Sequence, residues 1–190
     1  MRLLQASYTN LGGTTVRQFR CGHCGREVAS TQGWTHGNEP NVFIQVCPMC
    51  GRPNYFEGES QIPGPRAGSE VLHLPAAVES LYEEARKVLA ADAPTSATLA
   101  LRKLLMHVAV EKGAPAGGSF QQYVTFFETN HLVPVGATDW IDHIRKKGNE
   151  ANHEIVTISR PDADELLIFT EMLLKLTYEF PNRLPKKPTP

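Results

Sequence analysis

Four cysteines, arranged as two Cys-x-x-Cys pairs, constrain the fold of this 190-residue chain more than any other feature. The pairs are Cys21 and Cys24 in "CGHCG" and Cys47 and Cys50 in "CPMCG". This spacing lets both thiolates of a pair reach one ion, and the small residue after each pair lets backbone amides turn back towards the sulfurs. Two pairs complete four ligands and leave no open position for water. We therefore predict a structural metal site that holds zinc.

The region around the cysteines, residues 1–59, is predicted to form a small β module, because it contains short strand-like runs such as "NVFIQVC". The cysteine pattern resembles a zinc ribbon. Its main alternative is a redox Cys-x-x-Cys, which normally occurs once and at a helix start. The aromatic residues of the module are expected to form its core; alternatively, they form a base-stacking platform beside Arg17, Arg20 and Arg26. These aromatic residues are Phe19, Trp34, Phe43, Tyr55 and Phe56.

The composition changes after the β module. Residues 60–73 are rich in Pro, Gly and Ser and are predicted to be a linker, whereas residues 74–180 show helical periodicity. Residues 181–190 are Pro-rich and basic and are predicted to be a disordered tail. Helix-capping and helix-breaking residues divide the helical part into about five helices. We therefore predict a mainly α fold, a bundle of about five helices preceded by the small β module.

Individual residues are expected to start or pack these helices. Thr95 or Ser96 is expected to cap the second helix, and Ser119 with Gln122 has capping-box spacing for the third. Pro161 suits the first turn of the fifth helix. An apolar seam on the fifth helix is expected to pack between neighbours, and it comprises Leu166, Phe169, Leu173, Leu176 and Phe180.

The stretch "IRKKGNEANHEI", residues 144–155, places Gly148 inside a predicted helix. At about 100° per residue, Gly148 falls on the apolar face of this predicted helix, which we expect to be buried. A glycine on that face lets another helix approach closely. A polar strip borders this face and presents a cation, an amide and an imidazole in line, a set that could bind a phosphodiester. Alternatively, the same side chains bond to adjoining helices. The strip contains Arg145, Asn149, Asn152 and His153.

Three segments of the helical part resemble the bacterial domain-of-unknown-function 4145 family. They are "ATLALRKLLMHVAVEKG", "DWIDHIRKKGNEANHE" and "DADELLIFTEMLLKL". This family is similar to the HEPN superfamily of helical bundles, many of which are dimeric, metal-independent endoribonucleases of toxin and anti-phage systems. The family hallmark matches Trp140, Ile144, Arg145, Gly148, Asn149, Ala151 and His153.

The resemblance implies roles for individual residues. His153 would act as general base or acid, Arg145 would stabilise charge on the phosphate, and Asn149 would orient the phosphate or the imidazole. These three are the candidate catalytic residues. The HEPN motif normally has its arginine at position 148, where this chain has Gly148, so Arg145 would have to replace it from one turn earlier. The candidate substrate-binding residues are Arg102, Asn152 and Lys146.

Two classes of function stay open. The first is an RNA-binding protein of a bacterial defence or stress system that cleaves RNA without metal. The second is a non-catalytic adaptor or dimerisation module that recruits a nuclease, a helicase or nucleic acid. Gly148 favours the second class, and the retained Arg145, Asn149 and His153 favour the first. Either class is expected to form a homodimer and to have a protein partner in a defence system.

Charge and hydropathy exclude further classes. The net charge of −1 gives no global basic field, so any nucleic-acid site must be a local patch. No apolar run approaches membrane-spanning length, so we expect a cytoplasmic protein without a membrane partner. The closed four-thiolate site excludes a zinc enzyme, since no ligand position is vacant.

Overall fold

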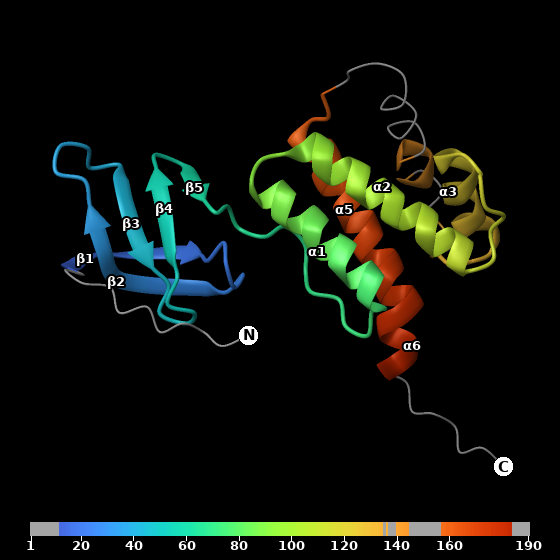
Figure 1. The fold of residues 1–190 in the computed structure, drawn as a ribbon, viewed down its shortest axis with the longest axis horizontal. Helices are drawn as coiled ribbons and strands as arrows, with labels where there is room; N and C mark the ends of the chain where they lie inside the picture. Colours follow the sequence, from blue (N-terminus) through green and yellow to red (C-terminus); the bar gives the residue numbers. More distant parts are fainter. Residues whose placement is uncertain (1–11, 135, 137–139, 145–156, 184–190) are drawn as a thin grey trace, which may run out of the picture. The chain divides into compact units, whose positions relative to one another are not determined.

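The computed structural model describes residues 12–134, 136, 140–144 and 157–183. The chain divides into two compact units, Met1–Arg66 and Ala67–Pro190 (Figure 1). The first unit is built from strands and the second from helices. The boundaries predicted after residues 59, 73 and 180 stay predictions.

The first unit is a five-stranded antiparallel sheet in which each strand pairs with the next along the chain. Its strands are β1 (Gly12–Arg20), β2 (Glu27–Thr35), β3 (Val42–Val46), β4 (Pro53–Glu57) and β5 (Ser60–Ile62). Consecutive antiparallel strands need only short turns between them. The turns between β1 and β2 and between β3 and β4 carry the two cysteine pairs.

The predicted mainly α fold is wrong, because this sheet makes the chain an α+β protein with its strands in the N-terminal part. The first two strands explain the error. Their sequences, "GGTTVRQFR" and "EVASTQGWT", contain few apolar residues, and most of their positions are exposed. Sequence patterns reveal strands through alternation or apolar runs, and these strands show neither strongly.

The core of the sheet unit is small. Phe19 and Val28 are buried together with Cys21 and Cys47, and Phe56 packs against them. The cysteines form no disulfide. A core of this size rarely stabilises a fold alone, so a unit like this one needs a further cross-link, such as a metal ion.

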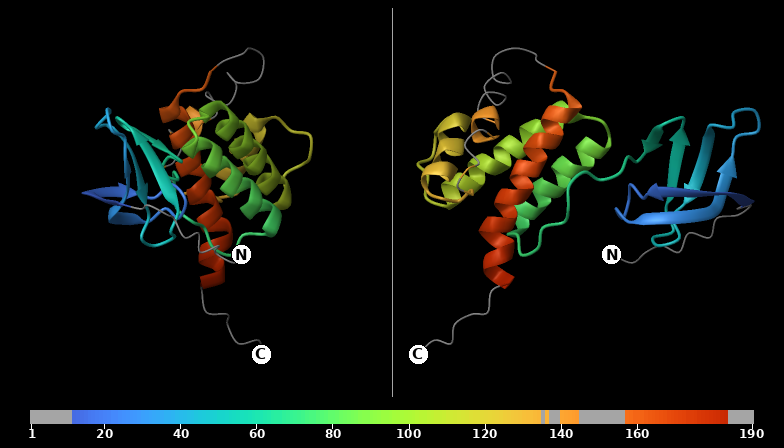
Figure 2. Two further views of the ribbon diagram at one scale, coloured as in Figure 1. Left: turned by 60° about the vertical axis from the view of Figure 1, so that its left-hand side comes forward. Right: turned by 180° about the vertical axis from the view of Figure 1, so that it is seen from behind.

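The second unit consists of helices around one apolar core. Its elements are α1 (Ala76–Ala90), α2 (Pro94–Glu111), α3 (Phe120–Thr129), α5 (Arg160–Leu174), the π-helical turn η1 (Lys175–Glu179) and α6 (Phe180–Arg183). Residues 140–144 form a further helical turn. The central helix is α2, which contacts α1, α3 and α5 (Figure 2). Within the described part of the chain, each helix is too short or too polar to cross a lipid bilayer.

Two of the predicted helix starts are confirmed. The amide of Gln122 donates to Ser119 Oγ at 3.3 Å, and the amide of Ser119 donates to Gln122 Oε1 at 2.7 Å, so the capping box of α3 is complete. Pro161 lies in the first turn of α5, as predicted. Both starts follow from interactions within four residues.

The predicted cap of α2 is wrong. This helix begins at Pro94 without a side-chain cap. The hydroxyl of Thr95 instead accepts a hydrogen bond of 3.2 Å from the amide of Ile158. A contact with a residue so distant in sequence therefore takes the place of the local cap.

The predicted seam of the fifth helix is only partly buried. Leu166, Phe169 and Leu173 lie in the core, but Leu176 and Phe180 are 37% and 47% exposed. The change occurs at η1, where the wider π-helical turn alters the direction in which later side chains point. The helix then continues as α6 to Arg183, which lies in the predicted tail.

Carboxylates of α5 and η1 accept hydrogen bonds from the segment that precedes α1. The amide of Ser69 donates to Glu171 Oε2 at 2.7 Å, and the amide of Leu72 donates to Glu179 Oε2 at 3.0 Å. Burial opposes ionisation of Glu171. Nevertheless, hydrogen bonds from Lys175 and from Ser69 outweigh burial and lower the pKa of Glu171 below its ordinary value.

We predict that Glu171 contributes to acid sensitivity. Because its folded-state pKa is lowered, its stabilisation is complete above the unfolded pKa of about 4.3 and is lost as the pH falls through the folded pKa. Glu171→Gln should lower the free energy of unfolding at pH 7 by about 1–3 kcal/mol. It should also flatten the pH dependence below pH 5, as measured by urea unfolding. Glu84→Gln, at an exposed position on α1, is the control, and an equal effect of both variants would contradict the prediction.

Candidate functional site

The four cysteines converge at one end of the sheet unit. Their sulfur atoms all lie within 4.8 Å of one another. The Sγ atoms of Cys21 and Cys50 are 3.7 Å apart, and those of Cys24 and Cys47 are 3.8 Å apart. A tetrahedral ion with metal–sulfur bonds of about 2.3 Å separates its sulfurs by about 3.8 Å. The four thiols therefore fit a closed, structural metal site.

The backbone shapes both cysteine turns in the same way. The amide of Gly25 donates to the carbonyl of Cys21 at 2.8 Å, and the amide of Gly51 donates to the carbonyl of Cys47 at 2.8 Å. Both glycines have positive φ, 71° and 67°, which side-chain-bearing residues rarely adopt. The glycine after each pair is thus required by the turn that aims the thiols.

Hydrogen bonds prepare Cys21 to be a thiolate. Although burial raises its pKa, amide hydrogen bonds from Cys24 and His23 and a side-chain bond from Asn54 lower the pKa to about 7. Asn54 Nδ2 lies 3.6 Å from the sulfur, and Asn54 Oδ1 accepts a bond of 2.9 Å from the amide of Gly22. One buried amide side chain therefore links β4 to the first cysteine turn.

The two histidines near the cysteines are outside this ligand set. Nε2 of His23 lies 2.9 Å from the carbonyl oxygen of Pro53, to which the ring can donate. His36 is exposed on the turn after β2, where its Nδ1 accepts a 3.4 Å bond from the amide of Asn38. The structure thus brings together the four cysteines that the sequence predicts.

The aromatic residues of the sheet unit form part of its packing. Phe19 and Phe43 are each 8% exposed, and Phe56 stacks on Phe43 with ring centroids 4.8 Å apart. The guanidinium of Arg17 lies 3.6 Å from the centroid of Phe43. These faces are already covered by protein groups, which favours the core interpretation over a base-stacking platform.

Most of the candidate catalytic and substrate-binding residues lie outside the part of the chain that the structure describes. Of the predicted set, Arg102 alone lies within the described residues, and the others fall in the segment 145–156, outside them. Those others are Arg145, Lys146, Asn149, Asn152 and His153.

Arg102 is buried on α2, with 6% of its surface exposed. Its guanidinium carbon lies 4.7 Å from the ring centroid of Phe120 on α3, a cation–π contact. Burial lowers the pKa of Arg102, but an arginine remains charged at physiological pH. A buried positive charge therefore lies where α2 and α3 meet.

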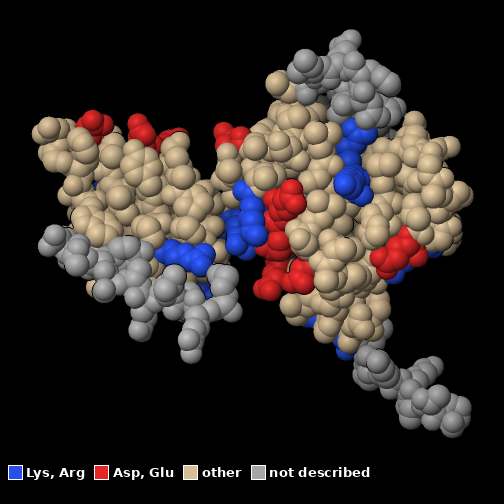
Figure 3. All heavy atoms as spheres, in the orientation of Figure 1, with Lys and Arg blue, Asp and Glu red and all other residues tan. Residues whose placement is uncertain are grey.

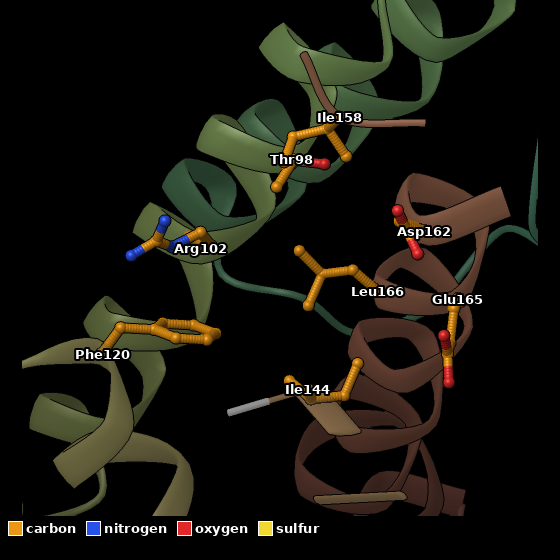
Figure 4. Close-up of a pocket in the computed structure, with 8 residues that line it drawn as sticks. All are labelled: Thr98, Arg102, Phe120, Ile144, Ile158, Asp162, Glu165 and Leu166. Atoms are coloured by element: carbon orange, nitrogen blue, oxygen red, sulfur yellow. The ribbon is translucent and has the colours of Figure 1, made fainter. Parts of the chain in front are cut away.

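A cavity of about 20 Å³, enough for about one water molecule, adjoins Arg102 between α2 and α5 (Figure 4). Its wall is completed by Ile144 and Ile158, which lie on either side of the segment 145–156. The side chains contributed by the long helices are Thr98 and Arg102 of α2, Phe120 of α3, and Asp162, Glu165 and Leu166 of α5.

Sequence reasoning missed several of these cavity residues. Thr98 lies one turn before Arg102 on the same face of α2, so helical spacing could have grouped the two. Phe120 was visible only as the first residue of the third helix. Asp162 and Glu165 carry no sequence signal that separates them from solvated surface charges, because one sequence does not show which carboxylates face a cavity.

Comparison with known families identifies the helical unit. The family model described as "Domain of unknown function (DUF4145)" matches residues 83–187, which is more than half of the chain. This chain belongs to the DUF4145 family. The match covers α1 from Glu83, α2, α3 and α5, so the DUF4145 region contains the cavity and Arg102. Searches of curated proteins and of solved structures gave no match.

We predict that one lost thiol abolishes metal retention. Cys50→Ser should weaken metal binding roughly 100-fold or more and unfold the sheet unit, because a closed site needs all four ligands. The helical signal in circular dichroism should persist. Elemental analysis after gel filtration gives the metal content. Met49→Ser, which changes a 56%-exposed residue of the same turn, is the control, and full metal content in Cys50→Ser would contradict the prediction.

Proposed function

We propose that this DUF4145 member is an HEPN-like, RNA-binding protein of a bacterial defence or stress system that cleaves RNA without metal. The supporting observation is the position of Arg102. This buried cation lines a cavity whose wall includes Ile144 and Ile158, the residues that flank the segment bearing the predicted catalytic groups. A fixed positive charge in a cavity lined by these two flanking residues suits a phosphodiester site.

The proposed chemistry requires proton transfer and charge stabilisation. RNA supplies its own nucleophile, the 2′-hydroxyl, so no metal-bound water is needed. His153 acts as general base or acid because the pKa of a histidine lies near working pH. Arg145 stabilises the charge that develops on the phosphate, and Asn149 orients the phosphate or the imidazole.

In this proposal Arg102 does not contact the substrate directly. At 6% exposure its guanidinium is too buried to be a main contact for an RNA backbone. Its charge instead positions the residues around the cavity and adds positive potential there. Asn152 and Lys146 provide the more direct substrate contacts. Arg102 is accordingly a positioning residue, and Arg145 is a catalytic one.

The charge distribution agrees with a local site. Figure 3 shows one face of the chain, on which basic and acidic side chains occur in small groups of both signs. The net charge is −1. Non-specific phosphate attraction is therefore weak, and RNA affinity depends on a few placed cations.

For the sheet unit we propose a zinc ribbon. Four thiolates in a closed tetrahedron suit zinc, which binds soft sulfur ligands and imposes no competing geometry. The fit of the sulfur–sulfur distances supports this choice. The metal has a structural role here, and the elemental analysis of the wild-type protein identifies it.

We predict that the purified protein cleaves structured RNA in buffer without added divalent ions. His153→Ala should slow cleavage by about 100-fold or more, because general acid–base groups contribute about that factor. Arg145→Ala should lower both cleavage and binding. Arg102→Ala should reduce cleavage more than binding. Products are analysed for 2′,3′-cyclic phosphate ends, which internal attack by the 2′-hydroxyl leaves.

Control variants remove an exposed histidine and an exposed cation of α2 that do not line the cavity. His107→Ala removes an exposed histidine of α2, and Lys103→Ala removes a neighbouring exposed cation. Both should cleave like the wild type. RNA that stays intact with every form, or equal loss with His107→Ala and His153→Ala, would reject the catalytic proposal.

The second candidate function is a non-catalytic dimerisation module. An apolar stripe along α5, η1 and α6 supports dimerisation, which both candidate functions expect. Ile168, Leu176 and Phe180 are 58%, 37% and 47% exposed, and Met172 lies half-buried between them. Residues four apart drift by about 40° per step on an α-helix. The wider turn η1 offsets part of this drift, so the stripe stays on one side.

We propose that a second copy of this chain covers the stripe. Asp164 lies four residues before Ile168, and Arg183 lies three residues after Phe180, so opposite charges mark its two ends. Their side chains are 41% and 57% exposed, and each already pairs within its own chain, Asp164 with Arg160 at 3.1 Å and Arg183 with Glu179 at 2.8 Å. A partner charge would therefore have to share or replace these pairs. Antiparallel pairing about a two-fold axis would place each Asp164 near Arg183 of the partner subunit.

We predict that Phe180→Glu and Leu176→Glu shift the protein towards monomer by about 10-fold or more in dissociation constant, as measured by sedimentation velocity. Leu99→Glu, at a 53%-exposed apolar position on α2, should leave the dimer intact. Asp164→Arg should weaken the dimer, and adding Arg183→Asp should restore it. A wild type that is monomeric at tens of micromolar would contradict a dimer through this stripe.

A further inference from the structure

His143, Asp162 and Glu165 form a second cluster of potential metal ligands, in the helical unit. One ligand atom from each lies within 4.8 Å of the other two. Nε2 of His143 is 2.8 Å from Glu165 Oε2. Neighbouring ligands of an ion with bonds of about 2.1 Å are about 3 Å apart, so only small side-chain adjustments separate this cluster from a coordination shell.

Rigid elements support the three side chains. Asp162 and Glu165 are three residues apart on α5 and so project from one face of it, within its first two turns. The hydroxyl of Ser159 donates to Asp162 Oδ2 at 2.7 Å and restrains that carboxylate. Ligands held on helices keep their geometry better than ligands on loops.

The helical turn 140–144 is equally well anchored. Ile141 and Ile144, on either side of His143, are 1% and 3% exposed. The ring of Trp140 meets that of Phe169 edge to face, with centroids 5.3 Å apart. Packing thus fixes the backbone of His143 opposite α5, while its imidazole remains 44% exposed and reachable from solvent.

A buried hydroxyl gives a second sign of a polar ligand nearby. The Thr98 side chain is 5% exposed, and its Oγ1 has no hydrogen-bond partner among the residues that the structure describes. Figure 4 shows this oxygen on the side of α2 that faces α5, in the cavity also lined by Asp162 and Glu165. A hydroxyl in this position can bond to water that hydrates an ion.

We propose that His143, Asp162 and Glu165 bind a divalent transition-metal ion, with the remaining positions open to water. The set of one imidazole and two carboxylates suits Mn²⁺, Zn²⁺ or Ni²⁺ and differs from the soft thiolate site. Binding clamps the 140–144 turn to α5. The positive end of α5 and the charge of Arg102 oppose the ion, so its affinity is well below that of the four-thiolate site. This site stands independently of the proposed RNA role.

The test uses Mn²⁺ as the probe, because thiolates prefer softer ions and the cysteine site is kept filled with its own metal. Electron paramagnetic resonance counts free and bound Mn²⁺ during titration of the full-length protein. The wild type should bind one Mn²⁺ per chain. His143→Ala and Glu165→Gln should each weaken this binding about 10-fold or more.

A matched control is available on α2. His107 and Glu111 form a similar exposed pair, 3.8 Å apart, that is not part of either potential metal-ligand cluster of the described residues. His107→Ala should bind Mn²⁺ like the wild type. No binding by the wild type at millimolar Mn²⁺, or unchanged binding by folded His143→Ala and Glu165→Gln, would reduce the cluster to an ion pair and overturn the proposal. Because binding is read without RNA, this outcome is separate from the cleavage result.

Discussion

The packing of α2 against α5 is the constraint on which the functional part of the helical unit depends. Leu101, Leu104 and Leu105 of α2 and Leu167 of α5 are almost fully buried in one apolar cluster. Each such side chain contributes about 1.5–3 kcal/mol on burial. Because apolar side chains fix the register of the two helices, the polar residues just beyond them have defined neighbours. Arg102 is thereby held in a buried position that its own charge would disfavour.

The sheet unit depends on a different kind of stabilisation. Its apolar core is too small for ordinary hydrophobic stabilisation, and Cys21 and Cys47 occupy part of that core. A metal bound by four thiolates would add a cross-link between the two turns and couple binding to folding. Close packing reinforces this end of the unit. A Cβ on Gly22 would approach the carbonyl oxygen of Pro63 to 2.0 Å, so the first turn accepts only glycine there without a backbone shift.

Local interactions were predictable from the sequence. The capping box of Ser119 and Gln122, the first-turn Pro161 and the convergence of the cysteines all follow from spacing within a few residues or from a shared ligand. Long-range interactions were not. The hydroxyl of Thr95 accepts a hydrogen bond from the amide of Ile158 and does not cap its own helix. No local sequence pattern indicates this long-range contact.

The errors have similar causes. The sheet was underestimated because backbone hydrogen bonding, rather than apolar patterning, defines its first two strands. The exposure of Leu176 and Phe180 follows from the π-helical turn, which periodicity at 3.6 residues does not anticipate. His143 and Glu165 lie far apart in sequence, and their pairing depends on how the 140–144 turn packs.

The measurement that tests the proposed phosphate site most directly is an NMR titration of the protein with a short structured RNA, following the side-chain Nε–H signal of Arg102. The proposal predicts a saturable shift of this signal that Arg145→Ala abolishes, because Arg102 lines a cavity with Ile144 and Ile158, the residues that flank the segment proposed to bind phosphate. RNA that shifts only signals of the sheet unit, and leaves Arg102 unchanged at saturation, would contradict a site on the helical unit.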